Sequence, residues 1–429
     1  MTNAIVASTI TLITLIFILT EKMNRAIVAM AGGGVMLVAG MVLGFYNEEL
    51  ALEAIEWEAL GLLLGMMILV SLLVPTGFFQ YAAVKASQLS KGNPWRLVLL
   101  LGAGTALVSL FFNNVTTVVL VGPITILVTE LIGISPIPIL MAQALLSDTA
   151  DVGTSVGDPA SVLVASASGY NFTDFLTHSM PIVLVAAAVT LLMLRILFAD
   201  EMRQKPSDPD LVAKLNAQET LKDRTTTRRV MIVLGFAVLL FIFQGKLGLS
   251  SAFIAIMAAT VALVWIQPDL PAVLERIDWH ILVFFIGLFV LVGGLSASGA
   301  FEPFTQFLAQ FANSNPILLG VLIIWIVAGL SALLDNVPVT IAMISLLQGL
   351  QMSGVNVSAL WWAVVFGAGF GGNATSIGSG ANIVIVSLSD KTKTPITPSM
   401  WSRKGLPIAI ATCIVGSVLF VLAYDWLGG

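Results

Sequence analysis

The feature that most constrains the fold of this chain is a series of apolar segments that recurs from one end to the other. Most are roughly 17–25 residues long, enough to cross a bilayer core about 30 Å thick. The chain is 58% hydrophobic and only 10% charged, whereas soluble globular domains carry about 25% charged residues. The sequence therefore predicts an all-α polytopic membrane protein.

The apolar segments are interpreted as ten transmembrane helices and two re-entrant hairpins. The hairpins, 97–130 and 317–350, have short legs and turn at polar residues. Two spans, 137–168 and 359–389, contain glycine-rich polar breaks and are predicted to be discontinuous helices at the midplane. The other spans are 4–20, 27–45, 58–76, 179–199, 230–244, 250–267, 280–298 and 406–427.

The distribution of lysine and arginine predicts the orientation. If the loop 200–229 is cytoplasmic, every basic residue except Lys246 falls on the cytoplasmic side, as the positive-inside rule requires. Both termini are then predicted outside. The first span, 4–20, lacks a basic stretch before it and a small-residue cleavage site, so we interpret it as a retained helix.

The chain resembles itself at an offset of 222 residues. The segment IEWEALGLLLGMMILVSLLVPTGFF (55–79) aligns with IDWHILVFFIGLFVLVGGLSASGAF (277–301), and further along NNV (113–115) aligns with DNV (335–337). Each half contains five spans, an odd number, so the two copies are predicted to be inverted. The predicted organisation is a first repeat (1–199), a cytoplasmic linker (200–229) interpreted as a solvated tether, and a second repeat (230–429).

Four polar segments fall at membrane depth, two in each half: FFNNVTT, SDTADVGTSVGDPAS, LLDNVPVT and GGNATSIGSGAN. Irregular backbone occurs there only where it lines a cavity or is buried in protein. Matching broken segments in inverted repeats indicate a transporter site near the midplane. The predicted substrate-binding residues offer neutral donors and acceptors: Asn113, Asn114, Thr117, Thr149, Thr154, Ser155, Asn336, Asn373, Thr375, Ser376, Ser379 and Asn382.

Several of these residues are also expected to cap helices. Asp158 precedes Pro159, which is typical of a helix start, and Ser379 is its counterpart in the second repeat. Asn114 and Asn336 are predicted to cap the second legs of the hairpins. Each helix start would direct a terminus carrying about half a positive charge toward the midplane.

Acidic residues in the same segments predict ion coupling. A carboxylate at the bilayer centre costs about 3 kcal/mol even on lenient scales and usually marks an ion or proton pathway. The predicted topology leaves no lysine or arginine at that depth to pair with these acids. Because the second break contains no acid, we expect the first to handle the proton and the second mainly the substrate. The predicted coupling residues are Asp148, Asp151, Asp158 and Asp335.

The blocks FFNNVTTVVLVGP and GGNATSIGSGANIV resemble those of the ion-transporter superfamily, namely the ArsB arsenite permeases, the NhaD-type sodium/proton antiporters and the P-protein branch. The resemblance covers essentially the whole chain. It implies a transport domain of hairpins and broken helices held in a scaffold, with elevator-like alternating access. Asp148-Thr149 is closer to the arsenite permeases, whereas VGDPAS is closer to the P-protein branch.

Three substrates remain open. Arsenite at neutral pH is an uncharged triol, and Cys413 is the only cysteine, so its hydroxyls would be recognised by Asn, Ser and Thr side chains. Sodium would be bound by backbone carbonyls beside a carboxylate. An organic anion ranks third, because no cationic side chain is predicted to reach the site. We therefore predict proton-coupled export of arsenite or antimonite, with NhaD-type sodium/proton exchange as the alternative.

The remaining expectations follow from this prediction. No catalytic residue or enzyme activity is expected, because an intramembrane aspartyl protease would need a Gly-x-Gly-Asp block. A channel is the other alternative, and it predicts passive flux that does not respond to a proton gradient. The proton gradient is the driving force, with no cofactor, and with no bound metal unless the substrate is sodium. The predicted partners are the substrate, protons and lipid, without nucleic acid. The resemblance leaves room for a homodimer and, for an ArsB-like protein, an ATPase subunit, in the inner (plasma) membrane.

Overall fold

The computed structural model describes residues 2–20, 22–204, 206–207, 211–212 and 215–428. Within these ranges the chain forms helices, turns and loops, and contains no strand. Seven of the described helices are long and apolar enough to cross a membrane. Shorter apolar helices of 10–17 residues accompany them. The predicted all-α class is confirmed.

The first repeat and the linker contain most of the short elements. The 3-10 turns η1 (Val74–Thr76) and η2 (Asp151–Gly153) follow α4 and α8, and a π-helix, η3 (Phe175–Ser179), precedes α11. The α-helices are α1 (Thr2–Leu19), α2 (Arg25–Leu43), α3 (Glu48–Glu53), α4 (Trp57–Leu73), α5 (Phe78–Ser90), α6 (Pro94–Ser109), α7 (Asn114–Ile132), α8 (Ile137–Ala150), α9 (Pro159–Ser168), α10 (Phe172–Asp174), α11 (Met180–Leu197), α12 (Ala199–Met202) and α14 (Ala217–Thr220).

The second repeat follows the same order of elements. Its helices are α15 (Arg224–Leu247), α16 (Ser251–Ile266), α17 (Leu270–Glu275), α18 (Trp279–Ala297), α19 (Glu302–Ser314), α20 (Pro316–Ser331), α21 (Asn336–Met352), α22 (Ser358–Gly372), α23 (Gly380–Ser389), α24 (Pro398–Leu422) and α25 (Tyr424–Leu427). The short helices α5 and α19, which precede the two hairpins, were not anticipated from the sequence.

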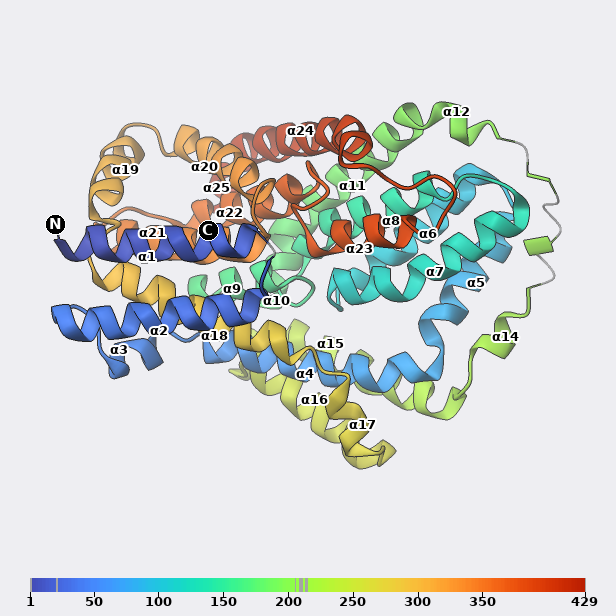
Figure 1. Ribbon diagram of the computed structural model, residues 1–429, viewed down its shortest axis with the longest axis horizontal. Helices are drawn as coiled ribbons and strands as arrows, with labels where there is room; N and C mark the ends of the chain where they lie inside the picture. The colour runs from blue at the N-terminus through green and yellow to red at the C-terminus, as the bar shows by residue number, and fades with distance from the viewer. Residues whose placement is uncertain (1, 21, 205, 208–210, 213–214, 429) are drawn as a thin grey trace.

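The two repeats run in opposite directions. In Figure 1, α4 leads from α3 on the left toward α5 on the right, whereas α18 leads from α17 on the right toward α19 on the left. The hairpin α6–α7 accordingly lies on the right and the hairpin α20–α21 on the left. The inverted arrangement predicted from the odd number of spans is thus present.

Helices at equivalent positions also exchange partners between the repeats. Helix α2 packs along α18, and in the same way α16 packs along α4. Helix α7 contacts α23, and its counterpart α21 contacts α9. These crossed pairs are what a twofold relation between the repeats requires. They also bring the two hairpins and the two broken helices together.

Both predicted broken helices are discontinuous. Helix α8 ends at Ala150, and α9 begins at Pro159, where the Asp158 carboxylate accepts a hydrogen bond from Ala160 N at 2.9 Å. Between α22 and α23, the Ser379 hydroxyl accepts one from Ala381 N at 3.2 Å. The predicted caps at Asp158 and Ser379 are therefore confirmed.

The described parts of the linker are docked on the first repeat instead of forming a free tether, although many of their side chains are exposed. Ser207 N donates to Ile132 O at 2.9 Å, and Lys222 N donates to Thr76 O at 2.9 Å. The Gln88 side chain donates to Leu215 O at 2.6 Å. These contacts arise because the linker returns over α5 and the ends of α4 and α7, where its backbone satisfies exposed carbonyl groups. Residues 205, 208–210 and 213–214 of the linker lie outside the described residues.

Candidate functional site

The centre of the site is a buried amide that joins two acids. Asn114 Nδ2 donates to Asp148 Oδ1 and to Asp151 Oδ2, each at 2.8 Å. Both aspartates are fully buried, and Asn114 is 4% exposed. Among the described residues, no donor reaches Asp148 Oδ2 or Asp151 Oδ1. The tip of the first hairpin thus holds two carboxyl groups that keep one unused oxygen each.

A hydroxyl from the second repeat joins the same network. Ser379 Oγ donates to Asp148 Oδ1 at 2.8 Å, while it also caps α23. Asp148 therefore contacts the first hairpin and the second broken helix at one oxygen atom. The two breaks meet at this carboxylate, although the sequence suggested separate proton and substrate roles for them.

The equivalent amide in the second repeat has neutral surroundings. Asn336, with its nitrogen turned toward acceptors, donates to Ser331 Oγ at 2.6 Å and to Ala368 O and Gly378 O at 3.2 Å. No carboxylate takes part in this set of contacts. The same residue type at equivalent hairpin tips therefore has an acidic partner set in one repeat and a carbonyl partner set in the other.

The predicted hairpin caps are displaced by one residue. Helix α7 is capped by Asn113, whose Oδ1 accepts from Val115 N at 2.9 Å and Thr116 N at 3.4 Å. Helix α21 is capped by Asp335. The expectation that Asn114 and Asn336 are the caps is wrong. The residue before each buried asparagine takes the extended conformation of a cap, which turns the asparagine inward.

Several predicted substrate residues instead hold backbone groups. Thr154 Oγ1 donates to Leu110 O, and its counterpart Thr375 Oγ1 donates to Ala332 O, so each break is tied to the first leg of its own hairpin. Thr117 and Thr149 donate to the carbonyls four residues earlier, Asn113 O at 3.1 Å and Leu145 O at 2.7 Å. Ser155 and Ser376 are buried at 1% and 8% exposure.

Two further asparagines stabilise the breaks. Asn373 Nδ2 donates to Thr149 Oγ1 at 3.0 Å and to Leu145 O at 3.2 Å, which joins α22 to α8. Asn382 Nδ2 donates to Gly372 O at 2.9 Å and to Thr375 O at 3.0 Å. Trp401, which was not among the predicted site residues, donates from Nε1 to Asn373 O at 3.2 Å. These amides hold the glycine-rich backbone that the helices leave unsatisfied.

A small central cavity of about 40 Å³ lies where four helices begin. The starts of α7, α9, α21 and α23 all line it, so their positive N-terminal ends converge there. Asp148 and Asp151 lie behind this wall, because neither lines the cavity. The predicted residues that do line it are Asn113, Asn114, Asp158, Asp335, Asn336 and Ser379.

A cation reaches this site, which the sequence prediction excluded. Arg25 Nη1 lies 2.8 Å from Asp335 Oδ2, and the Arg25 guanidinium lies 5.4 Å from the centre of the Phe284 ring. The prediction was wrong because Arg25 was placed in an interfacial loop. In the fold, the start of α2 reaches the tip of the second hairpin. A basic residue opening a helix, where the dipole disfavours it, was the available signal.

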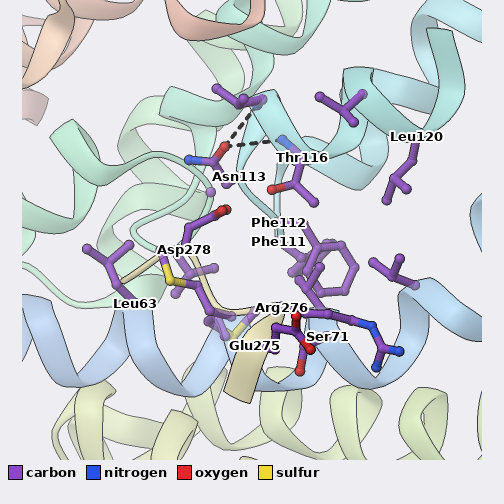
Figure 2. Close-up of a pocket in the computed structure, with 18 residues that line it drawn as sticks. Leu63, Ser71, Phe111, Phe112, Asn113, Thr116, Leu120, Glu275, Arg276 and Asp278 are labelled. Carbon is purple, nitrogen blue, oxygen red and sulfur yellow. Dashed lines mark hydrogen bonds between the residues drawn. The ribbon is translucent and has the colours of Figure 1, made fainter. Parts of the chain in front are cut away.

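Two larger cavities flank the hairpin tips. The first, about 430 Å³, lies between α4 and the first hairpin, with Asn113 and Arg276 in its lining. In Figure 2 the Asn113 oxygen faces the start of α7 while its nitrogen points away from that helix, and Arg276 lies at the opposite end of the cavity. The second cavity, about 320 Å³, is lined by Arg25, Asp335 and Ile377. We call these the first and second vestibules.

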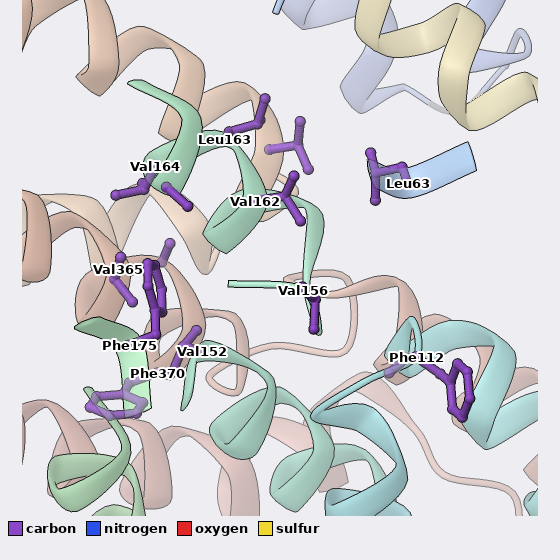
Figure 3. Packing of buried hydrophobic residues seen from close by; sticks show 14 of the residues in the cluster. Leu63, Phe112, Val152, Val156, Val162, Leu163, Val164, Phe175, Val365 and Phe370 are labelled. Carbon is purple, nitrogen blue, oxygen red and sulfur yellow. The ribbon is translucent and has the colours of Figure 1, made fainter. Parts of the chain in front are cut away.

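Apolar side chains hold the first break in place between these cavities. Figure 3 shows Val152 and Val156 of the break among buried residues of neighbouring elements, including Phe175 and Phe370. Val152 is 1% exposed and Val156 is 3% exposed. The irregular backbone beside the acids is therefore packed in protein, as a segment at membrane depth requires.

Comparison with known proteins places this geometry in a family. The family model described as "Citrate transporter" (CitMHS) matches residues 15–367. The 46 kDa membrane protein of Mycobacterium leprae is 31% identical over 98% of this chain and 99% of its own length. The uncharacterized transporter Rv2685 of Mycobacterium tuberculosis is 33% identical over 99% of this chain and its own full length.

More distant relatives agree. The human P protein is 28% identical over 96% of this chain, which spans 59% of that protein. The YdaH transporter of Alcanivorax borkumensis has the same fold, with a TM-score of 0.62 at 12% identity, over 95% of this chain and all of its own. The fold and its relatives define a multi-pass membrane transporter. The chain belongs to the CitMHS citrate transporter family, and the resemblance to the ion-transporter superfamily is confirmed.

Proposed function

We propose that the chain is a proton-coupled secondary active transporter in which Asp148 and Asp151 carry the proton. The observation that supports this most directly is the single Asn114 amide shared between the two carboxyl groups. Because Asp148 Oδ1 and Asp151 Oδ2 each lie 2.8 Å from Asn114 Nδ2, the distance between these two oxygens is at most twice 2.8 Å. Two negative charges at that spacing repel strongly in a buried site, so binding one proton relieves the pair.

The location of the pair links the proton to the substrate cavity. Asn114 lines the central cavity with one side of its side chain and donates to both acids behind it. Ser379 makes the same link from the second repeat. A substrate that draws either side chain toward itself weakens the hydrogen bonds that stabilise a charged Asp148. Proton binding and substrate binding are thereby coupled through two shared side chains.

Arsenite or antimonite is the first substrate candidate. The central cavity is small, about 40 Å³, and the amides and hydroxyl that line it match the hydroxyl groups of a compact neutral triol. The one cation at the cavity, Arg25 among the described residues, is paired with Asp335. In this proposal the hairpins and broken helices move as one body against α2, α4, α16 and α18. A proton enters the cell as the solute is exported across the inner membrane.

A carboxylate anion is the second candidate, and a specific observation favours it. Four helix N-termini and Arg25 surround the cavity, and such groups attract anions. The description of the matching family as citrate transporters supports the same direction. Sodium/proton exchange ranks third, because Asp158 and Asp335, the acids that line the cavity, are already engaged by Ala160 N and Arg25.

The test is proton movement in proteoliposomes that contain a pH-sensitive dye. Arsenite, sodium and citrate are added separately, and wild type is compared with Asp148→Asn and with the control Asp390→Asn, an exposed acid at the far end of α23. A response to arsenite that Asp148→Asn abolishes supports the first candidate. A response to citrate alone selects the second candidate, and a response to sodium alone removes both. Solute uptake without any proton movement contradicts the coupling itself.

A further inference from the structure

We propose that the Arg25–Asp335 ion pair is a gate, closed in this structure, between the second vestibule and the central cavity. Both residues line the second vestibule and both line the central cavity, so the pair lies in the wall between them. The inference rests on the proposed transport function, because it assigns the second vestibule as one of two access routes to the same site.

Each vestibule lies beside one hairpin tip, and Val115 of α7 lines both of them. Asn113 and Val156 line the first vestibule, and their counterparts Asp335 and Ile377 line the second. The other parts of the linings differ, because α4 and further residues of α7 line the first vestibule, whereas α23, the end of α1 and the start of α2 line the second. The central cavity shares Asn113 with the first vestibule and Asp335 with the second. The molecule therefore has one central cavity that two vestibules adjoin.

Arg25 connects parts that must separate during transport. It opens α2, and its guanidinium faces the ring of Phe284 on α18. Its ion-pair partner caps α21, a leg of the second hairpin. Helices α2 and α18 pack along each other, whereas the hairpin belongs to the group of elements that carries the site. Displacement of the hairpin relative to α2 breaks the pair.

The charges support a pair that opens rather than a permanent brace. Asp335 at a helix N-terminus is favoured by the dipole of α21, whereas Arg25 at the start of α2 is disfavoured. Arg25 therefore depends on Asp335, more than Asp335 depends on Arg25. The two side chains are 38% and 29% exposed, and ion pairs in contact with water are only weakly stabilising. Such a pair blocks the path between the second vestibule and the central cavity but costs little free energy to open.

The experiment measures access to the central cavity directly. Val337 lines that cavity and is 5% exposed. In a Cys413→Ala background, which removes the only cysteine, Val337→Cys reports modification by a small water-soluble thiol reagent. Met67→Cys, in the first vestibule, is the control reporter. Arg25→Ala should speed modification at position 337 by about fivefold, the factor that loss of a weak ion pair allows, and leave position 67 unchanged.

Two further variants keep the result interpretable. Lys22→Ala removes a charge from the same turn without touching the ion pair, and should leave both rates as in wild type. The double variant that combines Arg25→Asp with Asp335→Arg reverses the ion pair and should restore slow modification at position 337. This variant tests the gate even where Arg25→Ala does not fold. Equal rates at position 337 with and without the ion pair overturn the gate. Faster labelling in Arg25→Ala, together with no proton movement in wild-type proteoliposomes on adding arsenite, sodium or citrate, overturns the proposed function but not the gate.

Discussion

The two hairpin tips share a sequence pattern but place charge in opposite positions. In the first tip the half-buried cap is the neutral Asn113, and the buried Asn114 holds two acids. In the second tip the cap is Asp335, paired with Arg25, and the buried Asn336 holds neutral groups. Duplication therefore preserved the geometry of the tips while the charges diverged. One tip keeps its acids inside, and the other keeps its acid at a vestibule wall.

The largest expected effect comes from removing the buried acids of the first broken helix, which the first tip holds through Asn114. Asp148→Asn should abolish proton-coupled transport, because an amide does not bind and release a proton as a carboxyl group does. The fold should persist, since the side chain keeps its shape and a hydrogen-bonding oxygen. Flux and proton movement in proteoliposomes, with thermal unfolding in detergent, measure both effects. Full transport in Asp148→Asn and in Asp151→Asn would remove the proposed carriers.

The next comparison replaces the two buried asparagines. Asn114→Ala should lower stability by about 3 kcal/mol, because hydrogen bonds to charged groups are worth roughly twice neutral ones. Asn336→Ala should lower it by about 1–2 kcal/mol, because it leaves neutral acceptors unpaired. Unfolding in denaturant provides the measurement. The difference between the stability losses of Asn114→Ala and Asn336→Ala should shrink when both are measured in an Asp148→Asn background. If it does not, the acids are not the cause of the asymmetry.

A third comparison tests how the linker docks at one repeat only. Gly77 and Gly299 hold equivalent positions with φ of +79° and +75°, so alanine costs about 1–2 kcal/mol at either. A Cβ at Gly77 would also collide with Thr220 O, whereas one at Gly299 would meet the Glu302 side chain at 3.2 Å. Gly77→Ala should therefore speed limited proteolysis of the linker. Equal cleavage in the Gly299→Ala variant would show that docking of the linker does not depend on the close approach of Thr220 to Gly77.

The smallest effect is expected where the repeats agree. Thr154→Val and Thr375→Val each remove one hydroxyl that donates to an equivalent carbonyl, Leu110 O or Ala332 O. Each should cost about 1 kcal/mol, and the two losses should match within the error of a thermal unfolding experiment. A much larger loss of transport in one variant than in the other would show that its hydroxyl also contacts substrate.

Much of the architecture was predictable because it depends on local pattern. The odd number of spans in each half determined the inversion, and the Asp-Pro pair at 158–159 predicted a helix start that the structure contains. The hairpin caps were misplaced by one residue because Asn113 and Asn114 are the same residue type, and because Asp335 and Asn336 are equally good N-caps. Local propensity does not distinguish which of two adjacent asparagines turns into the core.

The partners of the charged groups were beyond sequence reasoning. Arg25 and Asp335 are separated by 310 residues, and nothing in either segment indicates the other. Eight of the predicted substrate residues do not line the central cavity, and several of their side chains instead satisfy backbone carbonyls of the hairpins, of α8 and of the second break. Composition shows that polar groups are needed at membrane depth. It does not show which of them face a solute.

By itself, the sequence determined that this chain crosses a membrane repeatedly, that it is built from two inverted copies, and that polar breaks interrupt its helices. Those properties follow from hydropathy, charge bias and self-similarity, which act locally or add along the chain. Only the tertiary structure decided that one amide would hold Asp148 and Asp151, and that Arg25 would face Asp335. The first pairing depends on how the hairpin packs against the broken helix of its own repeat, and the second on how the two repeats pack, because hydrogen bonds and ion pairs need approach within a few ångströms.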